Sequence, residues 1–223
     1  MQRERTVVLI SGRGSNMMSL VEAADAPGYP AEIVAVISNR PDAAGLGWAA
    51  GRGIATAVVD HKAFPGRPAF EEQLHQAISG FRADIVCLAG FMRVLTPNFV
   101  RLWQGRMLNV HPSLLPSFKG LHTQDQALAA GVRIAGCTVH FVVPEMDAGP
   151  ILIQGAVPVL PDDSADSLAA RILPIEHIIY PQALAMLASG SAAMTGDRVV
   201  YDTSRLSVNQ APFVISPDLG PNG

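Results

Sequence analysis

The chain has 223 residues, 49% of them hydrophobic, and its 16 basic and 19 acidic side chains leave a formal net charge of -3. This length and apolar content are sufficient for one sizeable core, and the charge balance argues against a broad basic surface for nucleic acid. Two cysteines in apolar runs, no metal-binding cysteine pattern, no signal peptide and no membrane-length apolar run predict a cytoplasmic protein without a metal or a membrane segment.

Strand-like and helix-like segments alternate through the first half of the chain. A continuous apolar run predicts a buried strand at residues 6–10, and further strands are predicted at residues 33–38, 55–60, 84–89 and 106–110. Helices are predicted between them, at residues 15–26, 43–51, 68–81 and 96–103, the last with Thr96 as its N-cap and Pro97 in its first turn. This alternation predicts an α/β fold, with a mostly parallel twisted sheet covered by helices on both faces.

The pattern loosens after His111, where a Pro-rich loop, HPSLLPSFKG, precedes a predicted helix at 123–131 that Thr123 would cap. Two further strands, at 138–143 and 151–160, are joined by the short link PEMDAGP, which predicts an antiparallel edge in the C-terminal half. A long helical pattern at 164–189 contains two prolines, so we expect a kink or two helices.

The predicted domain division follows this pattern. Residues 1–190 are expected to form the main domain, with residues 191–223 adding a small hairpin, including a strand at 198–202, and a poorly ordered tail. Because the tail lies beyond every motif, a chain that ends near Tyr201 should keep its turnover.

The glycine-containing segment GRGSN follows the first predicted strand and opens the first helix. Gly12 and Gly14 would let backbone amides approach a ligand, and the N-terminus of a helix favours an anion such as phosphate. The segment is not a complete dinucleotide fingerprint and lacks the P-loop lysine. An ordinary glycine turn is therefore the alternative.

Asn109 and His111 lie two residues apart at the end of the fifth predicted strand, so their side chains share one face. A carboxamide can stabilise an oxyanion, and an imidazole can move protons near neutral pH. Asp147, in the link beside Gly149 and Pro150, could bring a carboxylate to the histidine. Two satisfied polar residues at a strand end and an ordinary aspartate turn are the alternatives.

Taken together, these motifs resemble the folate-dependent formyltransferases. The resemblance rests on NVHPSLLPSFKGLHT and VHFVVPEMDAGPIL, supported by GRGSN and LAGFMRVL, and it runs from about Thr6 to about Gly190. It implies a Rossmann-like formyltransferase fold, a phosphate-binding N-terminal half and a folate-binding, catalytic C-terminal half. The implied reaction transfers the formyl group of 10-formyltetrahydrofolate, a cosubstrate, to the amine of 5'-phosphoribosylglycinamide in purine synthesis, without a metal.

The resemblance also implies roles for particular residues. The catalytic group would be Asn109, His111 and Asp147, with the aspartate favouring the charged imidazole and positioning a water. The phosphate and the glycinamide would be held by Gly14, Ser15, Asn16 and Glu176. The folate would contact Asn109, Arg67, Met92, Arg93, Val94 and Leu95, although a solvated loop arginine and an exposed helix carboxylate are the alternatives for Arg67 and Glu176.

Two positions depart from the family pattern, Gln124 where many members have histidine and Leu173 where they have a polar residue, and these put peripheral substrate contacts in doubt.

A deformylase would carry an N-terminal regulatory domain and a tRNA formyltransferase a C-terminal tRNA-binding domain, so the chain length favours the purine enzyme. A non-catalytic nucleotide-binding module is a rival of another class. The expected partners are small molecules, and a homodimer is the alternative to a monomer. The resemblance also favours a cis peptide bond at Leu115–Pro116.

Overall fold

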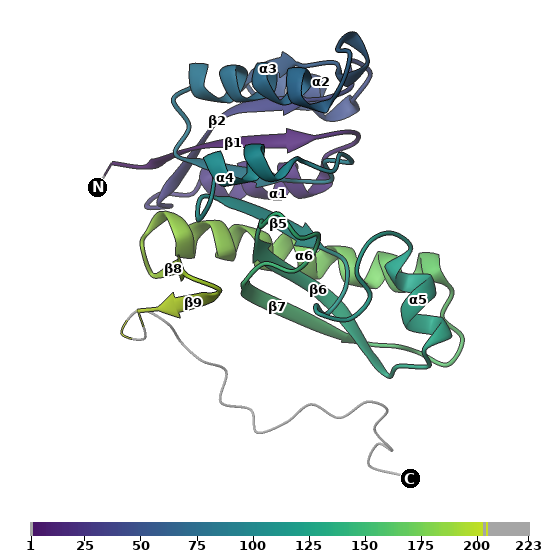
Figure 1. The fold of residues 1–223 in the computed structure, drawn as a ribbon. Coiled ribbons are helices and arrows are strands. Elements are labelled where there is room, and N and C mark those ends of the chain that lie inside the picture. Colours follow the sequence, from purple (N-terminus) through teal and green to yellow (C-terminus); the bar gives the residue numbers. More distant parts are fainter. Residues whose placement is uncertain (1, 203, 205–223) are drawn as a thin grey trace.

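The computed structural model describes residues 2–202 and residue 204, and the predicted tail beyond residue 204 lies outside the described residues. Seven strands form one sheet in the order β3-β2-β1-β4-β5-β6-β7 (Figure 1). These strands are β1 (Glu4–Ile10), β2 (Ala31–Ser38), β3 (Ala55–Val58), β4 (Ile85–Leu88), β5 (Met107–His111), β6 (Ile134–Phe141) and β7 (Ile151–Pro158). The first five are parallel and β6 is antiparallel to both neighbours, which confirms the predicted sheet and its antiparallel edge.

The helices are α1 (Ser15–Ala24), α2 (Ala44–Gly51), α3 (Arg67–Gly80), α4 (Pro97–Leu102), α5 (Thr123–Ala129) and α6 (Ala165–Ala188), with a short 3-10 helix η1 (His61–Ala63). Alternate residues of β1 supply two separate hydrophobic clusters, because successive side chains of a strand point to opposite faces. Val8 and Ile10 pack with side chains of α1 and α6, whereas Val7 and Leu9 pack with those of α3 and α4. The predicted cover of helices on both faces is confirmed.

Helix α6 corrects one expectation. It is a single helix of 24 residues with Pro174 and Pro181 inside it, so the alternative of two helices is wrong. Packing explains why the helix is continuous, because one face of α6 is buried along its length. This face includes Leu168, Ile172, Tyr180 and Leu184. Tertiary burial of one face therefore outweighs the loss of two backbone donors.

Two predicted caps have different outcomes. Thr96 caps α4 by accepting from the Phe99 amide at 3.4 Å, as predicted. Thr123 is instead the first helical residue of α5, where its hydroxyl donates to the Pro112 carbonyl at 2.9 Å, and His122 occupies the cap position. Because Thr123 is buried, its hydroxyl needs an acceptor within the protein, and the Pro112 carbonyl supplies it. The predicted cis peptide bond at Leu115–Pro116 is present.

After α6 the chain forms a hairpin of β8 (Ala192–Thr195) and β9 (Arg198–Tyr201). It is joined to the main sheet by Tyr201, whose hydroxyl donates to the Leu152 carbonyl of β7 at 2.8 Å. Within the described part of the chain, no helix combines the length and apolar character that crossing a membrane requires.

Candidate active site

The strand order places three chain segments at the carboxyl ends of neighbouring strands. The chain leaves β1 toward β2 and β3, and later returns to the other side of β1 with β4 and β5, so a crevice is expected between β1 and β4 at the carboxyl ends of the strands. The glycine segment follows β1, residues 90–95 follow β4, and Asn109 to His111 end β5. The segments singled out in the sequence are therefore neighbours in the fold.

The glycine segment is shaped to expose the first turn of α1. Gly14 has a φ of 73°, a left-handed conformation that favours glycine, and it stands at the N-cap of the helix without a side-chain cap. The amides at the start of a helix lack intrahelical acceptors and carry the positive end of the helix dipole. Ser15 and Asn16 open this turn, so the geometry suits the predicted anion.

Asn16 and Glu176 meet across the molecule. The Asn16 Nδ2 group donates to Glu176 Oε2 at 2.6 Å, which joins the first turn of α1 to the middle of α6. Burial raises the pKa of the Glu176 carboxyl, although the bond from Asn16 and the proximity of His111 act in the opposite direction. The Asn16 Oδ1 atom is buried and has no partner among the described residues, so it can accept a hydrogen bond from a ligand.

Asn109 is held by a histidine that the sequence analysis did not single out. Antiparallel pairing of β5 with β6 sets His140 directly opposite Asn109, and their side chains lie 3.2 Å apart between Asn109 Nδ2 and His140 Nε2. Because His140 Nδ1 lies 2.9 Å from the Phe141 carbonyl, which can only accept, Nδ1 carries the proton and Nε2 accepts from Asn109. One amide proton of Asn109 is thus engaged, and the second can serve a ligand.

His111 and Asp147 form the second part of the arrangement. The side chain of His111 is 6% exposed, and its Nδ1 lies 3.6 Å from Asp147 Oδ2. Its Nε2 donates to the Phe118 carbonyl at 3.0 Å. One ring nitrogen of His111 therefore faces a carbonyl oxygen, and the other faces a carboxylate. The predicted trio of Asn109, His111 and Asp147 is therefore brought together.

The Asp147 loop lies directly against β6. Asp147 has a φ of 51°, and its Oδ2 also accepts from the Gly120 amide at 2.8 Å. A Cβ atom added at Gly149 would lie 1.8 Å from the Phe141 carbonyl oxygen, so the strand and the loop can approach this closely only with glycine there. This approach sets Asp147 beside His111.

Replacing Gly149 by alanine should therefore displace the loop, lowering both the melting temperature and kcat. Overpacking of this kind typically costs about 1–3 kcal/mol. Thermal unfolding and turnover measure the two effects. The control is Gly47→Ala in α2, where an added Cβ meets nothing within 4 Å, and it should leave both unchanged or raise stability slightly. Equal behaviour of the two variants would contradict the close-approach argument.

His140 makes folding stability depend on pH. Burial lowers its pKa from the ordinary value of 6.5, with smaller contributions in the same direction from His111 and Lys119, while the Phe141 carbonyl and Asp147 act against it. The imidazole of His140 is therefore harder to protonate in the folded protein than in the unfolded chain. The contribution of neutral His140 to folding stability is fully present above the pKa that this histidine has in the unfolded chain. It is lost as the pH falls from that value through the lower pKa of the folded state.

Urea unfolding between about pH 5 and 8 should accordingly show a lower free energy of unfolding on the acid side. His140→Gln should reduce this slope without abolishing it, because burial also lowers the pKa of His177. An unchanged slope in the variant would show that His140 is not the group responsible.

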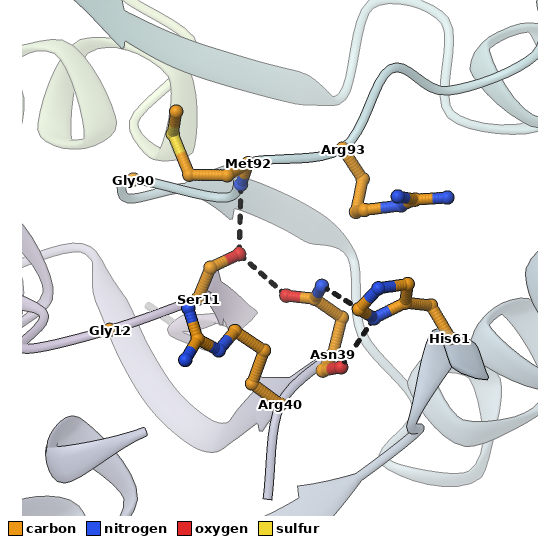
Figure 2. Close-up of a pocket in the computed structure, with 8 residues that line it drawn as sticks. All are labelled: Ser11, Gly12, Asn39, Arg40, His61, Gly90, Met92 and Arg93. Carbon is orange, nitrogen blue, oxygen red and sulfur yellow. Dashed lines mark hydrogen bonds between the residues drawn. The ribbon is translucent and has the colours of Figure 1, made fainter. Parts of the chain in front are cut away.

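Three residues of the segment after β4, Gly90, Met92 and Arg93, border a cleft of about 440 Å³. Figure 2 shows the side chains that line it, which come from the ends of β1, β2 and β4 and from η1. Met92 and Arg93 belong to this lining. Val94 is exposed, whereas the Leu95 side chain is buried in the core with Phe99. If Leu95 contacts a folate, it must do so mainly through its backbone.

Three other singled-out residues stand apart from these groups. Arg67 is exposed in the first turn of α3, and the structure gives its side chain no hydrogen bond or ion pair within the described residues. Gln124 is half-buried behind the Pro-rich loop, with its Nε2 3.5 Å from the Pro112 carbonyl. Leu173 is half-buried on α6. No group of three or more His, Cys, Asp or Glu side chains that could hold a metal is found in residues 2–202 and 204.

Comparison with known proteins agrees with this geometry. A family model described as "Formyl transferase" matches residues 4–184. The chain is 44% identical to the phosphoribosylglycinamide formyltransferase of Escherichia coli over 90% of its own length and 94% of that protein. It is 42% identical to a phosphoribosylglycinamide formyltransferase structure from Coxiella burnetii, with a TM-score of 0.86 over 90% of this chain and 94% of that chain.

The chain belongs to the formyl transferase family. It is also 50% identical, over 87% of its length, to the trifunctional purine biosynthetic protein adenosine-3 of Drosophila melanogaster, but it spans only 14% of that relative. The matched single-function proteins, in contrast, are covered almost completely.

Proposed function

We propose that this chain transfers the formyl group of 10-formyltetrahydrofolate to the amine of 5'-phosphoribosylglycinamide, giving formylglycinamide ribonucleotide and tetrahydrofolate in cytoplasmic purine biosynthesis. The observation that carries the proposal is the grouping of Asn109, His111 and Asp147 at the carboxyl end of β5, on the same side of the sheet as the glycine segment that opens α1. The proposed partners are these two small molecules, and residues 1–190 would carry the whole reaction.

The proposed chemistry is acyl transfer. The glycinamide nitrogen attacks the formyl carbon, and the carbonyl electrons move to oxygen to form a tetrahedral oxyanion. The free amide proton of Asn109 and the imidazolium of His111 stabilise this charge. Collapse of the intermediate breaks the bond to the folate nitrogen N10, and the proton lost by the attacking amine is delivered there by His111 or by a water that Asp147 positions.

The other predicted residues take binding roles in this proposal. The amides of Gly14, Ser15 and Asn16 would receive the phosphate. Glu176, with the unpartnered Asn16 Oδ1 beside it, would accept hydrogen bonds from the ribosyl glycinamide. The folate would lie along residues 92–95, with Arg67 as an additional proposed contact.

A transfer assay tests the proposal. The purified protein is given 10-formyltetrahydrofolate with 5'-phosphoribosylglycinamide, with water alone or with initiator tRNA, and release of tetrahydrofolate is followed. We expect rapid release only with the ribosyl glycinamide phosphate. Equal release in water would indicate a deformylase, release only with tRNA would indicate a tRNA formyltransferase, and no release with any acceptor would indicate a binding module.

The Glu176 assignment makes a separate prediction. Because burial raises its pKa, the cost of burying the charged carboxylate grows as the pH rises from the unfolded value of 4.5 through the folded pKa. Glu176→Gln removes this cost, so the melting temperature at neutral pH should stay the same or rise. The KM for the ribosyl glycinamide phosphate should nevertheless rise about tenfold. The exposed Glu72→Gln serves as control, and an unchanged KM in Glu176→Gln would remove its binding role.

A further inference from the structure

The segment after β4, residues 90–95, has no regular secondary structure, and few bonds hold it in place. Its far end is fixed by Glu71, whose carboxylate accepts from the amide and the hydroxyl of Thr96. In its middle, the Met92 amide donates to the Ser11 hydroxyl oxygen at 2.8 Å. This bond ties the segment to the end of β1.

The Ser11 hydroxyl is itself oriented by Asn39. The hydroxyl donates to Asn39 Oδ1 at 2.5 Å, and both residues are buried, with exposures of 5% and 2%. A serine hydroxyl has one proton, so engaging that proton with Asn39 leaves a lone pair facing Met92. Asn39 therefore determines, without touching Met92, that Ser11 acts as the acceptor for its amide.

His61 completes the chain of hydrogen bonds. Its Nδ1 lies 3.1 Å from Asn39 Nδ2 and 2.9 Å from the Asn39 carbonyl oxygen. When Nδ1 is unprotonated it accepts from Nδ2, and when it is protonated it donates to the carbonyl, so either tautomer holds Asn39. Figure 2 shows this Ser11–Asn39–His61 chain crossing from the Met92 segment to η1 along the cleft.

We propose that the Ser11–Asn39–His61 chain positions residues 92–95 for binding of the formyl folate. The three are positioning residues, because none is required to touch the reacting atoms and each acts through the next. This inference rests on the proposed function of residues 92–95. The hydrogen bonds connect the ends of β1 and β2 and the segment after β3 to the segment after β4. Four separate parts of the polypeptide would therefore set the shape of one binding surface.

Three variants test the proposal. Ser11→Ala removes the acceptor, Asn39→Ala removes the residue that orients it, and Asn39→Asp keeps an oxygen for the Ser11 proton. Ser38→Ala is the matched control, since Ser38 is fully buried on the same strand end but its hydroxyl accepts from the Arg40 amide at 3.0 Å. The measurements are amide hydrogen exchange at Met92, the KM for each substrate, tetrahydrofolate binding by calorimetry and the melting temperature.

Ser11→Ala and Asn39→Ala should each speed exchange at Met92 and raise the KM for 10-formyltetrahydrofolate about tenfold, with the KM for the ribosyl glycinamide phosphate unchanged. The double variant that combines Ser11→Ala with Asn39→Ala should show little more change in either measurement than each single variant, because the two residues act in series. Asn39→Asp should protect the Met92 amide from exchange better than Asn39→Ala does. Ser38→Ala should change neither the exchange at Met92 nor the KM for 10-formyltetrahydrofolate.

Unchanged Met92 exchange in Asn39→Ala, or equal rises in both KM values, would overturn the proposal. If Ser11→Ala does not fold, the Asn39 pair of variants decides alone. If the wild type lacks formyl transfer, the proposed function fails separately, and exchange at Met92 together with tetrahydrofolate binding still decides whether the chain positions this segment.

Discussion

Replacing Asn109 by alanine is expected to lower kcat by roughly 10²–10³-fold, which is the usual consequence of removing one preorganised donor to an oxyanion. The donor is preorganised here because His140 engages one of the two amide protons, which fixes the direction of the other. The KM values should change much less, since the oxyanion exists only after the amine has attacked. Steady-state kinetics on both substrates measure this separation.

The control for this variant is Asn98→Ala, which removes an exposed asparagine of α4 bonded to Arg101. It should leave both kcat and KM unchanged. A variant of Asn109 that keeps kcat while its KM rises would make Asn109 a binding residue and remove its proposed role in charge stabilisation.

Asp147→Asn is expected to lower kcat by about 10²-fold or more, within the range typical of groups that assist proton transfer. The substitution keeps the size of the side chain but removes the charge that faces His111 at 3.6 Å. It should disturb the loop little. Asparagine tolerates the left-handed backbone conformation that Asp147 adopts, and its amide oxygen can still accept from the Gly120 amide.

The melting temperature of Asp147→Asn should therefore stay close to that of the wild type. Glu145→Gln is the matched control, because it removes an exposed carboxylate of the same loop that lies 4.0 Å from Lys119. That control should retain full turnover. If Asp147→Asn also retained it, the aspartate would be a turn-forming residue whose charge plays no part in the chemistry.

Much of the fold could be predicted because it depends on local patterns. The alternation of strand-like and helix-like segments indicated the five parallel strands, and Thr96 followed by Pro97 indicated the start of α4. The number of helices after β7 could not be settled in this way. Pro174 and Pro181 argue for a break, and only the burial of Ile172, Tyr180 and their neighbours explains why α6 continues through both.

The site shows the same division between local and long-range information. Spacing alone placed Asn109 and His111 on one face of a strand, but no spacing relates Asn109 to His140, since that contact depends on the register between β5 and β6. Likewise, Ser11, Asn39 and His61 follow three different strands and meet only when the sheet has assembled. A polar residue at the end of each parallel strand is the signal that could have indicated them.

The bond between Asn16 and Glu176 has a consequence for how the protein survives in solution. These residues are separated by 160 positions in the chain, so their contact exists only while α1 and α6 remain packed together. A small molecule that contacts both would bind the native state and not the unfolded chain, and mass action would then oppose unfolding. Its presence should raise the thermal midpoint and slow proteolysis, so that substrate supply itself would protect the protein from degradation.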